Sequence, residues 1–172
     1  MRSRFTRLSA LLCLPGLAMS PVHLGAQPAV PSSPAPANNA AEAVATGSFD
    51  VTLTPSSEPD DPIASFALSK TFHGDLEGTS AGHMLAVRTP VEGSAGYVAM
   101  ERVSATLGGR TGTFALQHSG SMAAGTQTLS ITVVPDSATQ ALTGLKGSMD
   151  ITIEGAQHFY TLRYSLPSVA QD

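Results

Sequence analysis

The chain has 172 residues, of which 13% are charged and one is a cysteine, and its formal net charge at pH 7 is −4. An acidic chain without a cluster of Lys and Arg is poorly suited to nucleic acid or anionic membranes, because binding to either needs clustered positive charge. We therefore predict no nucleic-acid partner, and the single Cys13 excludes an internal disulfide framework.

The N-terminus has the order of features that is typical of a secretory signal peptide. Arg2, Arg4 and Arg7 precede an apolar run over residues 8–19, which is too short to span a membrane. Small residues follow this run and end at Ala26. We predict a signal peptide over residues 1–26 and a secreted or periplasmic protein without a stable membrane span.

Two other interpretations of this segment are weaker. A retained membrane anchor disagrees with Pro15 and Gly16, which interrupt the apolar run. A lipidated cysteine would need a small residue before Cys13, and the chain has Leu12 there. Removal of residues 1–26 takes away three arginines and no acids, which leaves six basic and 13 acidic residues and a net charge near −7.

Composition divides the remainder of the chain into three parts. Residues 27–46 are rich in Pro and Ala and have almost no bulky apolar side chains, so burial cannot offset their ordering entropy. We predict a disordered linker there. Residues 47–167 are about 120 residues, enough for one core, and residues 168–172 form a tail.

Residues 47–167 alternate apolar and polar residues with a period of two, which is typical of strands that have one buried face. Turns rich in Gly, Pro and Asp separate eight such segments, and one helical turn is expected at residues 137–142. An all-β antiparallel sandwich or closed barrel is predicted. The inward faces are expected to take every second residue of 49–53, 66–76, 83–87, 97–107, 114–118, 129–133, 149–153 and 160–166.

Three stretches of the domain have a specific pattern: KTFHGDLEGT at residues 70–79, ERVSATLGGRTGTFALQHSG at 101–120 and LTGLKG at 142–147. They resemble a bacterial domain family of unknown function that is grouped with the allene-oxide-cyclase-like barrels. The resemblance covers essentially residues 47–167 and implies an eight-stranded antiparallel barrel, in agreement with the strand count. It implies little about activity, because one fold hosts many functions, and no active-site residue of the plant cyclases can be matched to this chain.

Several polar residues fall on the predicted inward faces, where a small barrel is filled with side chains or holds one small ligand. Lys70, Glu101 and His118 are among them, and buried charges need partners, so we expect these residues to pair with one another. Glu101 and His118 are the candidate catalytic residues, because a desolvated carboxylate or imidazole beside an apolar cavity can transfer protons. The competing interpretation is a structural network in which every polar group is satisfied.

The candidate ligand-binding residues share the predicted inward faces. Tyrosines there could orient a substrate carbonyl, although a core aromatic with a solvated hydroxyl is the competing interpretation. These candidates are Lys70, His83, Tyr97, Tyr160 and Tyr164.

We predict no metal site and no cofactor. The histidines of the domain have no close spacing such as His-x-His, and Asp60-Asp61 lacks the further ligands that calcium needs. A hydrolase is disfavoured because the sequence has no Gly-x-Ser-x-Gly elbow.

Three functions fit these observations. The first is a module that binds a small apolar or amphipathic molecule inside the barrel, and the second is a cofactor-free isomerase or cyclase in which Glu101 or His118 transfers a proton. The third is a packed barrel that acts in protein assembly, with outward Val98 and Met100 marking a contact in a homo-oligomer. A cavity touching Glu101 or His118 favours the enzyme, an aliphatic and tyrosine lining favours the binder, and a filled interior favours assembly.

Overall fold

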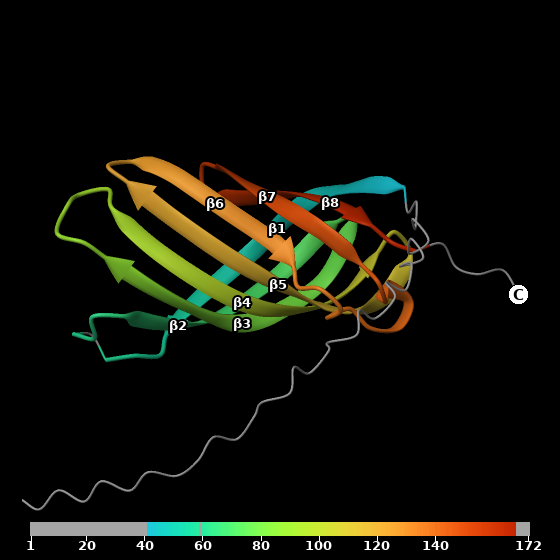
Figure 1. Ribbon diagram of the computed structural model, residues 1–172, viewed down its shortest axis with the longest axis horizontal. Helices are drawn as coiled ribbons and strands as arrows, with labels where there is room; N and C mark the ends of the chain where they lie inside the picture. Colours follow the sequence, from blue (N-terminus) through green and yellow to red (C-terminus); the bar gives the residue numbers. More distant parts are fainter. Residues whose placement is uncertain (1–40, 59, 168–172) are drawn as a thin grey trace, which may run out of the picture. The chain divides into compact units, whose positions relative to one another are not determined.

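Eight antiparallel strands, each paired with the next along the chain, close into a barrel (Figure 1). The computed structural model describes residues 41–58 and 60–167. The predicted eight-stranded antiparallel barrel is confirmed. The strands are β1 (Glu42–Pro55), β2 (Ala64–Gly74), β3 (Leu76–Arg88), β4 (Ala95–Leu107), β5 (Arg110–Ala123), β6 (Thr126–Val133), β7 (Lys146–Glu154) and β8 (Gln157–Ser165).

Pairing of the first strand with the last closes the barrel. β1 and β8 pair from Glu42 opposite Ser165 to Phe49 opposite His158. The shortest seam among the described strands lies between β6 and β7, which pair only at Thr132 and Ser148. A closed sheet has no free edge, so the backbone groups of the terminal strands are satisfied by one another.

β1 begins earlier than predicted, because residues 42–46 belong to the barrel and not to the linker. Ala45 is 1% exposed on the inner face and pairs with Leu162 of β8. Alanine is too small to mark a buried face in a hydrophobicity pattern, which is why composition placed these residues in the linker. The predicted signal peptide, residues 27–40 of the linker and the tail at 168–172 lie outside the described residues.

One half of the barrel interior is filled with apolar side chains. The connection between β6 and β7 contributes to it through the short 3-10 helix η1 (Gln140–Leu142), which falls within the predicted helical turn. η1 follows Thr139, whose N–H donates to the carbonyl of Thr113 on β5 at 2.8 Å. The buried apolar residues of this half include Leu76, Val103, Leu107, Phe114, Leu116, Leu142, Leu145, Met149 and Leu162.

The predicted facing of β3 is wrong by one residue. His83 lies on the outer face, and the outward Leu85 and Val87 are 47% and 42% exposed. Leu85 and Val87 thus point to solvent, and they set the pattern from which the inward face was predicted, whereas the neighbouring Met84 faces the interior.

Small residues occupy three successive inward positions in the middle of β3, Gly78, Ser80 and Gly82, where the backbone of β3 runs close to β4. A Cβ added at Gly82 would lie 2.0 Å from the carbonyl oxygen of Met100 and 2.6 Å from Cα of Glu101. Ser80 and Gly82 both face inward. Because neither residue is a large apolar one, a period-two hydrophobicity pattern does not identify this inward face.

The described part of the chain contains no helix that is both long and apolar enough to cross a membrane.

Candidate functional site

Four polar side chains meet inside the barrel, where the filled half ends. The carboxylate of Glu101 on β4 accepts hydrogen bonds at Oε1 from Lys70 Nζ of β2 at 2.7 Å and from His118 Nε2 of β5 at 2.8 Å. Ser80 Oγ of β3 donates to the other oxygen, Oε2, at 2.5 Å. Lys70, Glu101 and His118 are 6%, 2% and 3% exposed. The structure therefore brings together both candidate catalytic residues and one candidate ligand-binding residue.

The strand register explains why these side chains meet. Gly82 of β3 lies directly opposite Glu101, while Ser80 and His118 lie one inward position away along their strands. Because glycine leaves the space beside Glu101 empty, Lys70 reaches across β3 to the carboxylate. The four side chains of Lys70, Ser80, Glu101 and His118, which we call the polar group, thus depend on Gly82, a residue without a side chain that could form bonds.

Glu101 is ionised in this surrounding. Burial by itself would raise its pKa, but the hydrogen bond from His118, the charge and hydrogen bond of Lys70 and the hydrogen bond from Ser80 outweigh burial and lower the pKa to about 2. An ionised carboxylate only accepts hydrogen bonds, so Nε2 of His118 must carry the hydrogen between them. In the neutral imidazole, Nδ1 then holds the lone pair.

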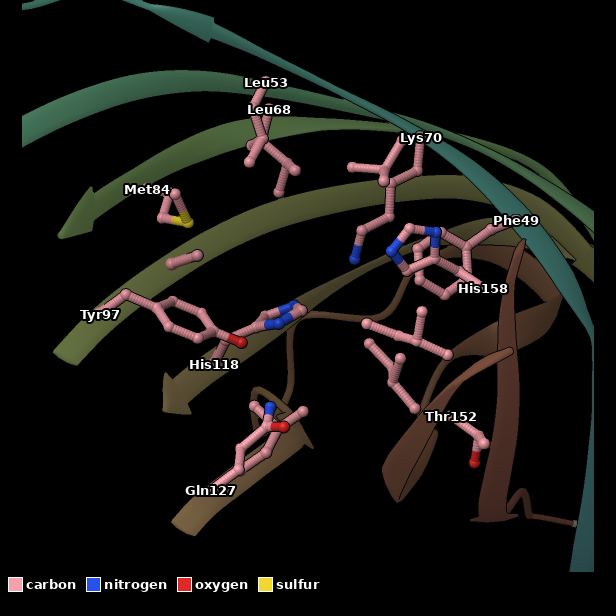
Figure 2. Close-up of a pocket in the computed structure, with 15 residues that line it drawn as sticks. Phe49, Leu53, Leu68, Lys70, Met84, Tyr97, His118, Gln127, Thr152 and His158 are labelled. Atoms are coloured by element: carbon pink, nitrogen blue, oxygen red, sulfur yellow. The ribbon is translucent and has the colours of Figure 1, made fainter. Parts of the chain in front are cut away.

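A cavity of about 560 Å³ occupies the other half of the barrel (Figure 2). Lys70 and His118 lie at its buried end, whereas Leu53 and Ile153 line it and are 44% and 59% exposed, so the cavity opens to solvent on their side. The interior is therefore not filled throughout. The lining is Phe49, Val51, Leu53, Leu68, Lys70, Met84, Tyr97, Ala99, His118, Gln127, Leu129, Ile151, Thr152, Ile153 and His158.

Tyr97 projects into this cavity from β4, and its ring lies across Gly120 of β5. A Cβ at Gly120 would lie 2.2 Å from Cε1 of Tyr97, so only glycine leaves room for this ring position. Burial, followed by the negative charge of Glu101, raises the pKa of Tyr97. The hydroxyl therefore stays protonated at neutral pH and can donate a hydrogen bond. Its ring points into the cavity with the hydroxyl end toward His118 (Figure 2).

Three candidate ligand-binding residues lie away from the cavity. His83 is on the outer face of β3. Tyr160 is buried against the turn between β2 and β3, where its hydroxyl accepts from Leu76 N–H at 2.8 Å and lies 3.3 Å from the carbonyl oxygen of His73. Tyr164 is half-buried and packs against the filled half. The inward facing predicted for both tyrosines is correct, but it places them among core residues.

Phe49, Ser80 and His158 belong to the site but were not predicted as site residues. The ammonium of Lys70 lies 4.9 Å from the centroid of the Phe49 ring, and the ring of His158 lies 5.1 Å from the same ring. Phe49 was predicted to lie on the apolar face of its strand, and the sequence pattern alone does not show that its ring contacts the ammonium of Lys70. Ser80 and His158 fell outside the predicted inward faces.

No group of three or more His, Cys, Asp or Glu side chains that could hold a metal ion occurs within residues 41–58 and 60–167. The site is instead a carboxylate–imidazole pair with a neutralising lysine, beside an apolar cavity that also contains a tyrosine hydroxyl. Such a site can hold a small molecule and can exchange a proton with it.

Comparisons with known proteins identify the family of this chain. Residues 45–164 match the family described as "Protein of unknown function (DUF3224)", and the chain belongs to that family. A crystal structure of a protein of unknown function from the same family, from Shewanella oneidensis MR-1, is 45% identical, covers 75% of this chain and 100% of its own, and has a TM-score of 0.70. No curated protein matches the chain. The predicted membership of a bacterial family of unknown function is confirmed.

Proposed function

We propose that this DUF3224 family member binds one small apolar or amphipathic molecule inside the barrel. The observation that carries the proposal is the cavity of about 560 Å³, which lies within the range of small-molecule sites. Its lining is mostly aliphatic and aromatic, so a ligand would gain affinity from burial of its apolar surface. A few polar groups at the buried end would fix its orientation.

The charges at the buried end favour a ligand with a neutral polar group over a carboxylate. The positive charge of Lys70 is already neutralised by Glu101 at 2.7 Å. Two neutral polar groups lie at this end, the hydroxyl of Tyr97, which donates, and Nδ1 of His118, which accepts in the neutral imidazole. A carbonyl or hydroxyl group fits this pair, with the apolar part of the molecule extending toward Leu53 and Ile153.

Filling the cavity is expected to abolish binding without unfolding the barrel. Ala99 is 5% exposed and lines the cavity beside His118, so Ala99→Trp would occupy the space of the ligand. We expect the neutral dye N-phenylnaphthylamine to bind the wild-type protein at one site, to be displaced by a long-chain alcohol, and to bind Ala99→Trp at least about tenfold more weakly, equal to about 1.4 kcal/mol. Fluorescence titration measures both affinities.

Ala81→Trp is the matched control, because Ala81 is exposed on the outer face of β3. It should bind the dye as the wild type does, and circular dichroism should show that both variants are folded. Equal dye affinity in wild type and Ala99→Trp would show that the cavity is not the binding site.

We also propose that binding takes place outside the cytoplasm. The support is the sequence of residues 1–26, with its arginines, short apolar run and small residues before Gln27. N-terminal sequencing of the chain recovered from the cell envelope or medium is expected to begin within a few residues of Gln27. A recovered chain that still begins at Met1 would contradict this localisation.

A further inference from the structure

We propose that the barrel is a cofactor-free isomerase of apolar carbonyl compounds, in which His118 moves a proton between two carbon atoms and Tyr97 donates a hydrogen bond to the carbonyl oxygen. This inference rests on the proposed function, because the compound must first occupy the cavity. It also assigns proton transfer to His118 alone and gives Glu101 a different role.

The hydrogen-bond geometry decides which atom takes the proton. Glu101 accepts from three donors, Lys70, Ser80 and His118, and is 2% exposed. These three donors engage both carboxylate oxygens inside the barrel wall, and Glu101 is not among the residues that line the cavity. His118 does line it, and its bond to Glu101 engages Nε2, which leaves Nδ1 as the basic atom of the ring. His118 is the catalytic base, and Glu101 is a positioning residue that selects its tautomer.

Tyr97 supplies the donor that this chemistry needs. Its strand pairs with that of His118, and Tyr97 lies opposite Gly120, the next inward position after His118 on β5. Inward residues at this diagonal spacing are about 7–8 Å apart at Cα, within reach of aromatic side chains. A small molecule in the cavity can therefore contact the Tyr97 hydroxyl and the His118 ring together (Figure 2).

The reaction balances without an oxidant, a reductant or a metal. In a β,γ-unsaturated ketone, Nδ1 of His118 takes a proton from the α-carbon, and the C–H electrons form a Cα=C bond while the carbonyl electrons move to oxygen. The Tyr97 hydroxyl stabilises the resulting dienolate by a hydrogen bond. The proton on Nδ1 then passes to the γ-carbon, which gives the conjugated ketone and restores neutral His118.

The test uses the full domain and a long-chain β,γ-unsaturated methyl ketone. Ultraviolet absorbance follows the conjugated product, NMR in deuterated water follows exchange at the α-carbon, and dye displacement measures binding. We expect the wild type to catalyse both reactions. His118→Ala should lose at least about 100-fold in kcat and Tyr97→Phe about 100-fold, while both still bind the ketone.

Three further variants separate a chemical role from a structural one. His118→Gln keeps a polar side chain in place should His118→Ala fail to fold, and it should be equally inactive. His83→Ala removes an exposed histidine from the outer face of β3 and should leave the rate unchanged. Glu101→Gln should lower kcat with little change in KM, and heteronuclear NMR should show that His118 no longer has Nε2–H as its main tautomer.

The outcomes distinguish this inference from the proposed function. Binding of the ketone with no exchange or isomerisation above the rate in buffer without protein would overturn the isomerase and leave the binding function intact. Equal rates in wild type and His118→Ala would overturn the assignment of the base. Failure of the cavity to bind the ketone, the dye or the alcohol would overturn the proposed function itself.

Discussion

Lys70→Met is expected to lower the free energy of unfolding by about 3–5 kcal/mol, because it leaves the carboxylate of Glu101 buried without its counterion. Glu101 is 2% exposed, and the ammonium of Lys70 is 2.7 Å from its Oε1. Methionine matches the apolar stem of lysine, so the loss reports the missing charge more than missing volume. Urea unfolding at neutral pH, followed by circular dichroism, measures the difference.

The double variant Lys70→Met/Glu101→Gln is the control, since it removes both charges. It should recover much of the stability lost in Lys70→Met, because a buried charge without a partner costs more than a neutral pair. A single variant as stable as wild type, or a double variant with the summed loss of both single variants, would show that the pair is not coupled.

The free energy of unfolding at acidic pH tests the contribution of the Glu101 charge in the wild-type protein. The pKa of Glu101 in the folded protein, about 2, lies below the ordinary value of 4.5. The stability that Glu101 contributes is therefore fully present above pH 4.5 and is lost as the pH falls toward 2. A shift of this size corresponds to about 3 kcal/mol. In Lys70→Met, where one cause of the lowered pKa is gone, this loss over the acid range should be smaller.

The sequence predicted the fold because the alternation on most strands places large side chains inward. On β4, Val103, Ala105 and Leu107 are buried on the same face as Glu101. The same periodicity assigned Lys70 and His118 to inward faces as well, so the core of the polar group was predictable from the sequence. A period of two determines which residues share a face. Charged side chains buried on that face must pair with one another, because an unpaired buried charge is costly.

The rest of the site could not be predicted, because it depends on residues that are absent from a hydrophobicity pattern. Gly82 and Gly120 shape the site by lacking side chains, one beside Glu101 and the other under Tyr97. Ser80 is small and polar and still faces inward. The pattern on β3 instead followed its exposed Leu85 and placed His83 inside. Which half of the barrel is filled depends on where the inward residues are large, and this is a property of three-dimensional packing.

The polar group lies at the boundary between the two halves, and this position connects stability with function. On β5 the inward residues Phe114 and Leu116 are fully buried, His118 follows them, and Gly120 then leaves space for Tyr97. The filled half therefore packs against the polar group on one side, and the cavity lies beside it on the other. A site of this kind depends on the packing directly beneath it.

Phe72→Ala is expected to lower the free energy of unfolding by about 3–5 kcal/mol, because Phe72 connects the filled half to the polar group. It is 1% exposed, its ring lies 5.6 Å from that of Phe49 and 5.7 Å edge-on from that of Tyr160, and the ammonium of Lys70 is 5.8 Å from its centroid. Removal of the ring leaves a void on the side of Lys70 that faces the core. Urea unfolding of the variant measures the loss.

Two variants calibrate this result. Phe72→Leu keeps most of the buried volume and should lose less than Phe72→Ala, whereas Val98→Ala, at an outer position that is 53% exposed, should change stability by no more than about 0.5 kcal/mol. Because the ring also supports Lys70, Phe72→Ala should bind the cavity dye more weakly under conditions in which it is still folded. Unchanged dye affinity in a destabilised Phe72→Ala would show that the filled half supports the fold alone and does not position the residues of the cavity.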